Sequence, residues 1–239
     1  MKVGRIRSGG YYRDYSWMAM VSYADAKRHL DLLLKGEGQP DEILLMEDML
    51  EREVMVTIVF SAMALESFAN DFVAGECGDE FFLQEVKWWD TVKKIKWIRK
   101  NILGGELNNE EGLFSLIKAL FRCRNLYVHN ESKDVSKEMF QNAMTDDEIS
   151  KMSDLSEEEN MAIYTISESK KRGLKEDIEV AHAAIDAIYG VAEFFERHEK
   201  GEGAMSLLFG AGRCGTYSKE EAQKVIQVQK EFGVPEIIF

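Results

Sequence analysis

The stretch from Leu113 to Glu131 reads LFSLIKALFRCRNLYVHNE, and the prediction of the fold begins with it. Its apolar residues recur every three or four positions, which is the spacing of one face of an α-helix. Such a helix would bury this face against other helices and would carry Arg124, Asn125 and His129 near its end. These three side chains form the one group in the sequence with a recognisable chemistry.

The composition favours an all-α fold around that helix. Among 239 residues, 45% are apolar and only two are proline, and long stretches contain no turn-forming residue. Many Met, Leu, Glu and Lys residues favour helices over strands. Because no internal repeat and no low-complexity linker divides the chain, we expect a single helical domain over residues 1–239.

The net charge limits the functions that the whole surface can perform. The chain has a formal net charge of −13. A protein that binds nucleic acid without sequence preference usually has a basic face, because contacts with phosphates supply most of the affinity. The charge therefore argues against a broad nucleic-acid binder, although it does not exclude one basic cleft.

Cysteine, histidine and hydropathy patterns predict a cytoplasmic protein without a metal or other cofactor. The three cysteines form no CxxC pair, which is typical of reduced thiols, and the four histidines lack metal-ligand spacing. The longest run without a charge, Val54 to Leu65, covers 12 residues. A bilayer needs roughly 20, so no membrane association is expected.

Periodicity predicts six helices, and one of them has an alternative interpretation. The β-branched cluster Val54–Val59 is compatible with a buried strand, but helix is preferred because no turn signal interrupts residues 41–70. The expected helices are Tyr15–Lys35, Asp41–Val73, Glu80–Ile102, the opening stretch, Asp177–His198 and Lys219–Phe232.

Three segments fall outside these helices. Residues 1–14 are basic and rich in glycine, and residues 132–174 form a charged, elaborated connection with one or two short helices. Within that connection, residues 161–167 (MAIYTIS) are alternatively a short strand. Residues 201–239 form a C-terminal extension that begins with a glycine-rich loop.

Two of the expected helices carry further polar candidates. Glu66 and Asn70 lie four residues apart, and so on one face, within the most apolar part of the second helix. A carboxylate in such surroundings needs a partner. The third helix alternates tryptophans with lysines; the tryptophans are expected in the core, whereas Lys93, Lys94 and Lys96 are candidate RNA contacts.

Arginine, asparagine and histidine together suit the cleavage of RNA without metal. In that reaction the 2′-hydroxyl attacks the adjacent phosphate, which requires a proton acceptor and donor near neutral pH. Histidine titrates in that range. Arginine supplies a permanent planar cation for the phosphate and for the charge of the transition state. Asparagine can orient a hydroxyl or a phosphate oxygen.

Helix geometry constrains how these residues meet. Asn125 and His129 are four positions apart, or about 40° around a helix, whereas Arg124 and His129 are about 140° apart. Either the helix ends between Arg124 and His129, or two chains combine their residues in a symmetric dimer. The alternative without catalysis is a surface arginine in a salt bridge and a histidine that complements the helix dipole.

The run RNLYVH, residues 124–129, resembles the R-N-x-x-x-H motif of the HEPN superfamily (higher eukaryotes and prokaryotes nucleotide-binding). The run ALESFAND, residues 64–71, is similar to the Glu- and Asn-bearing earlier helix of that family. The resemblance covers about residues 40–200, with Asp177–His198 as the closing helix.

The resemblance implies an up-and-down bundle of four to five core helices, with extra terminal helices, and metal-independent endoribonuclease activity. Many members of the family are dimers in toxin–antitoxin, phage-defence or RNA-processing systems, so a homodimer and an antitoxin protein are implied partners. Arg124 would bind the scissile phosphate, His129 would be the acid and base, and Asn125 would orient them. Glu66 would pair with Arg124 or with the polar network.

Other interpretations remain open at this point. Some HEPN members bind nucleotide, RNA or protein without cleavage, and a helical interaction protein could contain RNxxxH by chance. The tyrosine that follows the histidine in members paired with nucleotidyltransferase antitoxins is missing, because Asn130 and Glu131 stand there. Gly210, Gly212 and Gly215 spell G-x-G-x-x-G, but too few residues follow for a dinucleotide-binding unit, and a plain loop is favoured.

Overall fold

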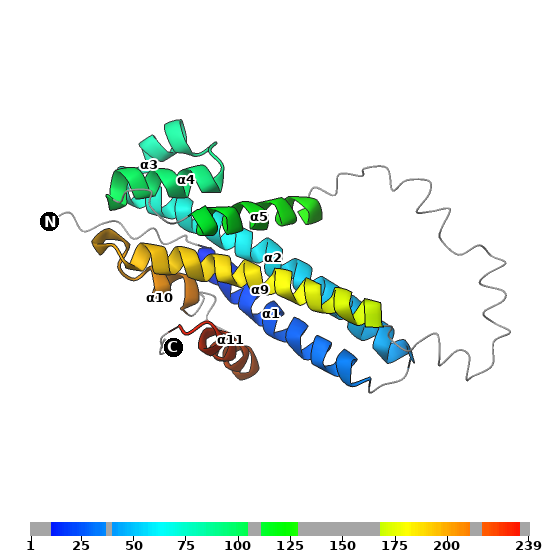
Figure 1. Ribbon diagram of the computed structural model, residues 1–239. Helices are drawn as coiled ribbons and strands as arrows, with labels where there is room; N and C mark the ends of the chain where they lie inside the picture. The colour runs from blue at the N-terminus through cyan, green and yellow to red at the C-terminus, as the bar shows by residue number, and fades with distance from the viewer. Residues whose placement is uncertain (1–10, 37–39, 105–110, 129–167, 211–216, 235–239) are drawn as a thin grey trace, which may run out of the picture.

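The computed structural model of the protein describes residues 11–36, 40–104, 111–128, 168–210 and 217–234 (Figure 1). Within these ranges every regular element is a helix and no strand occurs, which confirms the predicted all-α class. The elements are α1 Tyr12–Lys35, α2 Pro40–Cys77, α3 Asp79–Phe81, the π-helical η1 Phe82–Val86, α4 Thr91–Ile98, the π-helical η2 Arg99–Leu103, α5 Glu111–Val128, α9 Glu168–Glu196, the 3₁₀ turn η3 Glu199–Gly201, α10 Ala204–Phe209 and α11 Lys219–Glu231.

Helix α2 is the central element, because it contacts α1, α5 and α9 along its length (Figure 1). The buried side chains come from several sides of α2 and include Val54, Ile58 and Leu65. A helix that is apolar nearly all round is stable when it is surrounded by other helices. The alternative of a strand at Val54–Val59 is therefore wrong, because these residues lie within the continuous helix α2.

The length and apolar composition of α2 also satisfy the criteria for a membrane-spanning helix. Residues Asp41–Cys77 have a window of mean hydropathy 1.3, and half of that window (50%) is buried inside the protein. Core helices of soluble proteins share these properties, so the observation carries no argument for a membrane.

Two predicted boundaries near the ends of long helices need correction. Helix α1 begins at Tyr12, whose ring is buried edge-on against Phe68, so residues 12–14 belong to the fold rather than to the basic N-terminal segment. Helix α9 begins at Glu168, and the expected connection therefore ends at residue 167. The possible strand at residues 161–167 and the short helices expected at 132–167 lie outside the described residues.

The single helix predicted for Glu80–Ile102 is wrong. The chain instead forms α3 and η1, turns at Lys87–Asp90, and returns as α4 and η2 (Figure 1). Asp90 has extended backbone, and its side chain accepts a hydrogen bond of 2.8 Å from the Lys93 amide, as an N-cap does. This cap starts a new helix without any glycine or proline in the turn. The resulting α3–α4 projection extends from the end of α2.

The C-terminal extension is more structured than predicted. The segment expected as a glycine-rich loop contains η3 and α10, and Gly201 is needed there because a Cβ would lie 2.1 Å from the Phe195 carbonyl oxygen. Helix α11 starts with a capping box between Ser218 and Glu221. The Gln229 side chain donates 2.6 Å to the Phe209 carbonyl and so ties α11 to α10. Gly212 and Gly215 lie outside the described residues.

Candidate functional site

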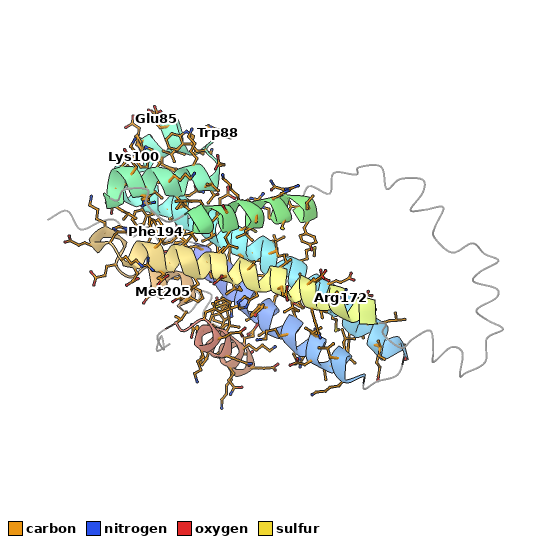
Figure 2. The ribbon with its side chains drawn as sticks, in the orientation of Figure 1. Glu85, Trp88, Lys100, Arg172, Phe194 and Met205 are labelled. Atoms are coloured by element: carbon orange, nitrogen blue, oxygen red, sulfur yellow. The ribbon has the colours of Figure 1, made fainter. Side chains whose placement is uncertain are left out.

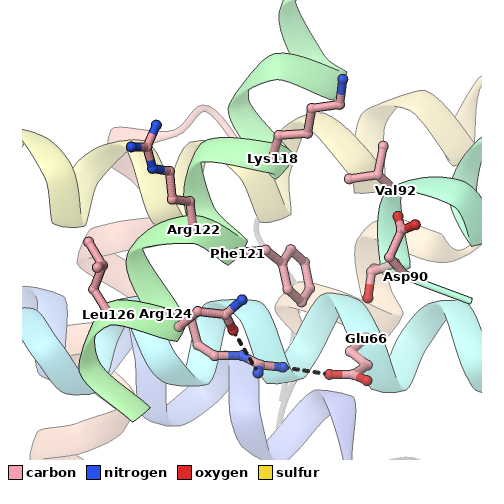
Figure 3. A pocket seen from close by; sticks show the side chains of 10 residues that line it. Glu66, Asp90, Val92, Lys118, Phe121, Arg122, Arg124 and Leu126 are labelled. Carbon is pink, nitrogen blue, oxygen red and sulfur yellow. Dashed lines mark hydrogen bonds and ion pairs between the residues drawn. The ribbon is translucent and has the colours of Figure 1, made fainter. Parts of the chain in front are cut away.

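A cleft of about 690 Å³ lies where α2, the start of α4 and the second half of α5 meet (Figure 3). Each of these elements supplies polar side chains, so the packing that forms the core also brings these groups together. The lining residues are Glu66, Asp90, Thr91, Val92, Lys118, Phe121, Arg122, Arg124, Asn125 and Leu126. Three of the predicted site residues, Glu66, Arg124 and Asn125, are therefore in one cleft.

Arg124 is held in place by contacts on two sides. Its Nη2 atom donates to Glu66 Oε2 at 2.9 Å, and its Nη1 atom donates to Asn125 Oδ1 at 3.1 Å. The guanidinium carbon lies 5.4 Å from the centre of the Phe121 ring. In Figure 3 the arginine extends from α5 toward Glu66 on α2. These contacts fix a planar cation at the wall of the cleft, which reduces the entropy cost of using it to bind an anion.

Arg124 still has unused hydrogen-bonding capacity. Within the part of the chain that the structure describes, its Nε atom is buried and has no hydrogen-bond partner. A guanidinium carries five N–H donors, and buried donors are usually paired. The side chain is 19% exposed, so it faces the cleft while most of its surface is covered. An anion in the cleft would meet the exposed part of the guanidinium rather than the buried Nε.

The charge of the cleft is opposite to that of the chain as a whole. Its lining contains three cations, Lys118, Arg122 and Arg124, against the carboxylates of Glu66 and Asp90. Lys118 and Arg122 are exposed and form no ion pair with any described residue. Asp90 is already engaged as the N-cap of α4. The local excess of cations therefore suits an anionic ligand, although the net charge is −13.

Asn70 lies one turn beyond Glu66 on α2 but is not among the residues that line the cleft. Its Oδ1 atom is buried and accepts no hydrogen bond from the described residues. The two residues share a helix face, as their spacing predicted. The structure thus brings Glu66 to Arg124 and leaves Asn70 behind the site.

His129 lies outside the described residues. The described part of α5 is continuous through Arg124 to Val128, so the helix does not end anywhere between these two residues. The last residues of this helix present apolar side chains to solvent: Leu126 is 67% exposed, Tyr127 44% and Val128 50%. An exposed apolar end next to a polar cleft is a common property of interaction surfaces.

The three lysines proposed as RNA contacts occupy different environments on α4. Lys93 Nζ lies 4.2 Å from the Trp89 ring centre, and Lys96 Nζ lies 5.0 Å from the Phe114 ring centre. Lys94 is only 1% exposed, and its Nζ donates 3.2 Å to the Lys87 carbonyl. Burial lowers the pKa of Lys94, an effect that the nearby carboxylates of Glu66 and Asp90 oppose. In this conformation Lys94 braces the turn and is shielded from ligands.

Sequence reasoning missed Lys118, Phe121 and Arg122, which line the cleft from α5 together with Arg124 and Asn125. The spacing of Lys118, Arg122 and Asn125, at intervals of four and three, was the available signal. It also missed Asp90, whose position before a Thr and a run of lysines is typical of an N-cap.

Among the described residues, no group of three or more His, Cys, Asp or Glu side chains is arranged to hold a metal ion. No family model, curated protein or solved structure matches the chain. What defines the protein is therefore its own geometry: an all-α fold with a cation-rich cleft around a fixed arginine.

Proposed function

We propose that the protein is a metal-independent endoribonuclease of HEPN type, which binds RNA in the cleft around Arg124. The observation that carries this proposal is the Glu66–Arg124–Asn125 group, joined at 2.9 Å and 3.1 Å within a cleft that has an excess of cations. The HEPN resemblance implies this pairing between residues 58 positions apart in the chain. An up-and-down bundle of the HEPN type is part of the proposal.

In the proposed reaction, the 2′-hydroxyl of RNA attacks the adjacent phosphorus, and the 5′-oxygen of the next nucleotide leaves. Arg124 donates hydrogen bonds to the non-bridging phosphate oxygens, whose negative charge increases in the transition state. His129 accepts the hydroxyl proton or protonates the leaving oxygen. Asn125 holds Arg124 by its side-chain oxygen, and Glu66 fixes the guanidinium from the opposite side.

A homodimer completes the proposed site. The described part of α5 ends at Val128, one residue before His129, so a helix end between Arg124 and His129 and a second chain both stay predictions. The exposed Leu126, Tyr127 and Val128 beside the cleft suit a contact between two copies. Two clefts on a symmetry axis would combine the arginine of one chain with the histidine of the other. An antitoxin protein and a cytoplasmic location belong to this proposal.

The second candidate function is RNA or nucleotide binding without cleavage. It is favoured by the Glu66 carboxylate, which neutralises part of the Arg124 charge that a transition state would need. In such a module the cleft would retain a phosphate by Lys118 and Arg122, and His129 would be dispensable. The two candidates differ in one measurable property, the dependence of RNA cleavage on residues 124 and 129.

The test is to incubate purified full-length protein with mixed RNA in EDTA, beside Arg124→Ala and His129→Ala. Arg197→Ala is a matched control, because Arg197 forms its own ion pair of 2.8 Å with Glu193 and does not line the cleft. Cleavage by the wild type and the control, lost in both site variants, supports the enzyme. Binding without cleavage in all four supports the second candidate, and equal cleavage in all four contradicts both.

A further inference from the structure

Trp88 departs most clearly from its expected place in the core. It is 82% exposed, more than any other large apolar side chain in the described part of the chain. Figure 2 shows it beside Glu85 at the outer edge of the α3–α4 projection. Its neighbours behave as expected: Trp89 and Trp97 are partly buried against the core, with ring centres 6.1 Å apart. A tryptophan exposed to this extent can contact another molecule.

The turn that carries Trp88 is firmly held. The Trp89 amide donates 2.9 Å to the Val86 carbonyl, and the Lys87 amide donates 2.8 Å to the Phe82 carbonyl. From below, the buried Lys94 ammonium donates to the Lys87 carbonyl at 3.2 Å. A turn fixed in this way presents the indole with little backbone freedom to lose, which favours binding through that ring.

A cation lies next to the indole. Lys87 Nζ lies 4.9 Å from the Trp88 ring centre, and residues 87–100 contain six cations and one acid. The single acid, Asp90, is engaged as the cap of α4, while Glu85 precedes the turn. An aromatic ring next to a lysine is the arrangement by which proteins hold single strands: the base stacks on the ring and the phosphate meets the cation.

Trp88 is also close to the cleft along the chain. Asp90, Thr91 and Val92 line the cleft, and Asp90 follows Trp88 by two residues, so their Cα atoms are at most about 7 Å apart. A strand whose phosphate lies against Arg124 would therefore pass near the indole with a neighbouring nucleotide. A double helix keeps its bases stacked on each other and could not offer one to the ring.

We infer that Trp88, with Lys87, stacks an unpaired base of the RNA strand that occupies the cleft, and that the substrate is single-stranded RNA. This inference rests on the proposed function in one respect, namely that the cleft receives RNA. It adds the class of substrate and a residue that determines it. Trp88 binds the strand next to the reacting phosphate and takes no part in proton transfer.

The inference is tested by binding of a fluorescein-labelled 2′-O-methyl oligouridine, alone or annealed to its complement. The strand cannot be cleaved by the proposed reaction, because it has no 2′-hydroxyl. The full-length variants are Trp88→Ala, Trp88→Phe and the control Leu83→Ala, since Leu83 is on the same projection and is 52% exposed.

We expect Trp88→Ala to weaken single-strand binding about tenfold, within the range for one stacked base. Trp88→Phe should stay within about threefold of the wild type because a ring remains, and Leu83→Ala should not differ from it. Duplex binding should be weak and equal in all four proteins. Equal single-strand affinities for Trp88→Ala and Leu83→Ala, equal binding of strand and duplex, or no binding by the wild type would each overturn the inference.

Tryptophan fluorescence tests the role of Trp88 independently of the proposed endoribonuclease function. The strand should quench emission of the wild type and of Arg124→Ala, but not that of Trp88→Phe, in which Trp17, Trp89 and Trp97 remain. If quenching depends on Trp88 but no RNA is cleaved in EDTA, the inference that Trp88 stacks a base is supported and the proposed endoribonuclease function is contradicted. If cleavage depends on Arg124 and His129 but no such quenching occurs, the endoribonuclease function is supported and the inference about Trp88 is contradicted.

Discussion

The molecule contains two polar clusters between helices, and they differ in how completely their charges are matched. At the junction of α1, α9 and α11, Tyr23 Oη lies 2.7 Å from His182 Nδ1 and donates 2.9 Å to Glu231 Oε1, while Lys27 pairs with Glu231 at 2.7 Å. The cleft at α2, α4 and α5 joins Arg124 to Glu66 but leaves Lys118 and Arg122 without a carboxylate among the described residues.

The contrast teaches how to distinguish a structural cluster from a binding site in this protein. In the α11 cluster every polar group named above finds a partner on another helix, and the His182 ring stacks on Phe232 with centres 4.7 Å apart. Such a cluster holds α11 in place. The cleft retains Lys118 and Arg122 without a carboxylate partner among the described residues, which suits an anionic ligand.

The largest effect should come from replacing Arg124 by lysine. We expect RNA cleavage to fall at least about 100-fold, because an ammonium cannot keep Glu66 and a phosphate in the geometry of a planar fork. The free energy of unfolding should change by less than about 1 kcal/mol, since partly exposed ion pairs contribute little. Initial rates in EDTA and urea titrations measure the two quantities. Full activity of this variant would remove Arg124 from the mechanism.

Tyr23→Phe should have the opposite effects, lowering the free energy of unfolding without changing RNA cleavage. The hydroxyl is buried between two helices, so its loss should lower the free energy of unfolding by about 1 kcal/mol, while cleavage stays unchanged. The cost stays near this value because His182 and Glu231 are exposed enough to regain water. Tyr11→Phe is the matched control, since Tyr11 is 63% exposed. If both variants unfold alike, the α11 cluster does not stabilise the fold.

Acid should weaken the α11 cluster in a defined range of pH. Burial raises the pKa of Glu231, but hydrogen bonds from Lys27 and Tyr23 outweigh burial and hold the pKa below its ordinary value of 4.5. The folded state therefore binds this proton more weakly than the unfolded state. Its contribution to stability is complete above pH 4.5 and is lost as the pH falls through the lowered pKa.

Glu231→Gln should remove that dependence. The difference in unfolding free energy between wild type and Glu231→Gln should be largest near neutral pH and should shrink as the pH falls below 4.5. Urea titrations across this range measure it, with Glu199→Gln as an exposed control on η3. A difference that is constant with pH would mean that Glu231 titrates as it does in the unfolded chain.

The smallest effect should be seen with Arg122→Ala in the salt dependence of RNA binding. One lost phosphate contact should lower the slope of log affinity against log salt by about 0.7 for a single strand. Arg52→Ala is the control, because Arg52 pairs with Glu53 at 3.4 Å and does not line the cleft. An unchanged slope would show that Arg122 makes no phosphate contact.

The sequence predicted the long helices but not how they meet. Apolar spacing identified α2 and α11 to within a few residues, because these helices are stabilised by burial of a continuous face. The turn at Lys87–Asp90 was missed because its only signal is the Asp90 cap. Trp88 was predicted in the core because large apolar side chains are usually buried. The turn at Lys87–Asp90 instead places its side chain at the surface.

Contacts between distant residues followed from the sequence only where a family resemblance supplied them. The Glu66–Arg124 pair was implied by the order of the HEPN-like motifs. No such guide existed for Tyr23, whose partners His182 and Glu231 lie 159 and 208 positions away. Helical periodicity fixes which face a residue occupies, but the crossing of two helices decides which faces touch.

The π-helical segment η1, Phe82–Val86, lets the projection accommodate one extra residue of chain length. A π turn contains more residues than an α turn, so it behaves as an α-helix with an inserted residue. Deleting one residue of this segment would leave four residues that can form an ordinary α turn, which completes nearly the same rotation as the π turn it replaces. A single-codon deletion here should therefore leave the direction of residue 88 nearly unchanged, whereas the same deletion inside an α-helical segment would rotate the following residues by about 100°.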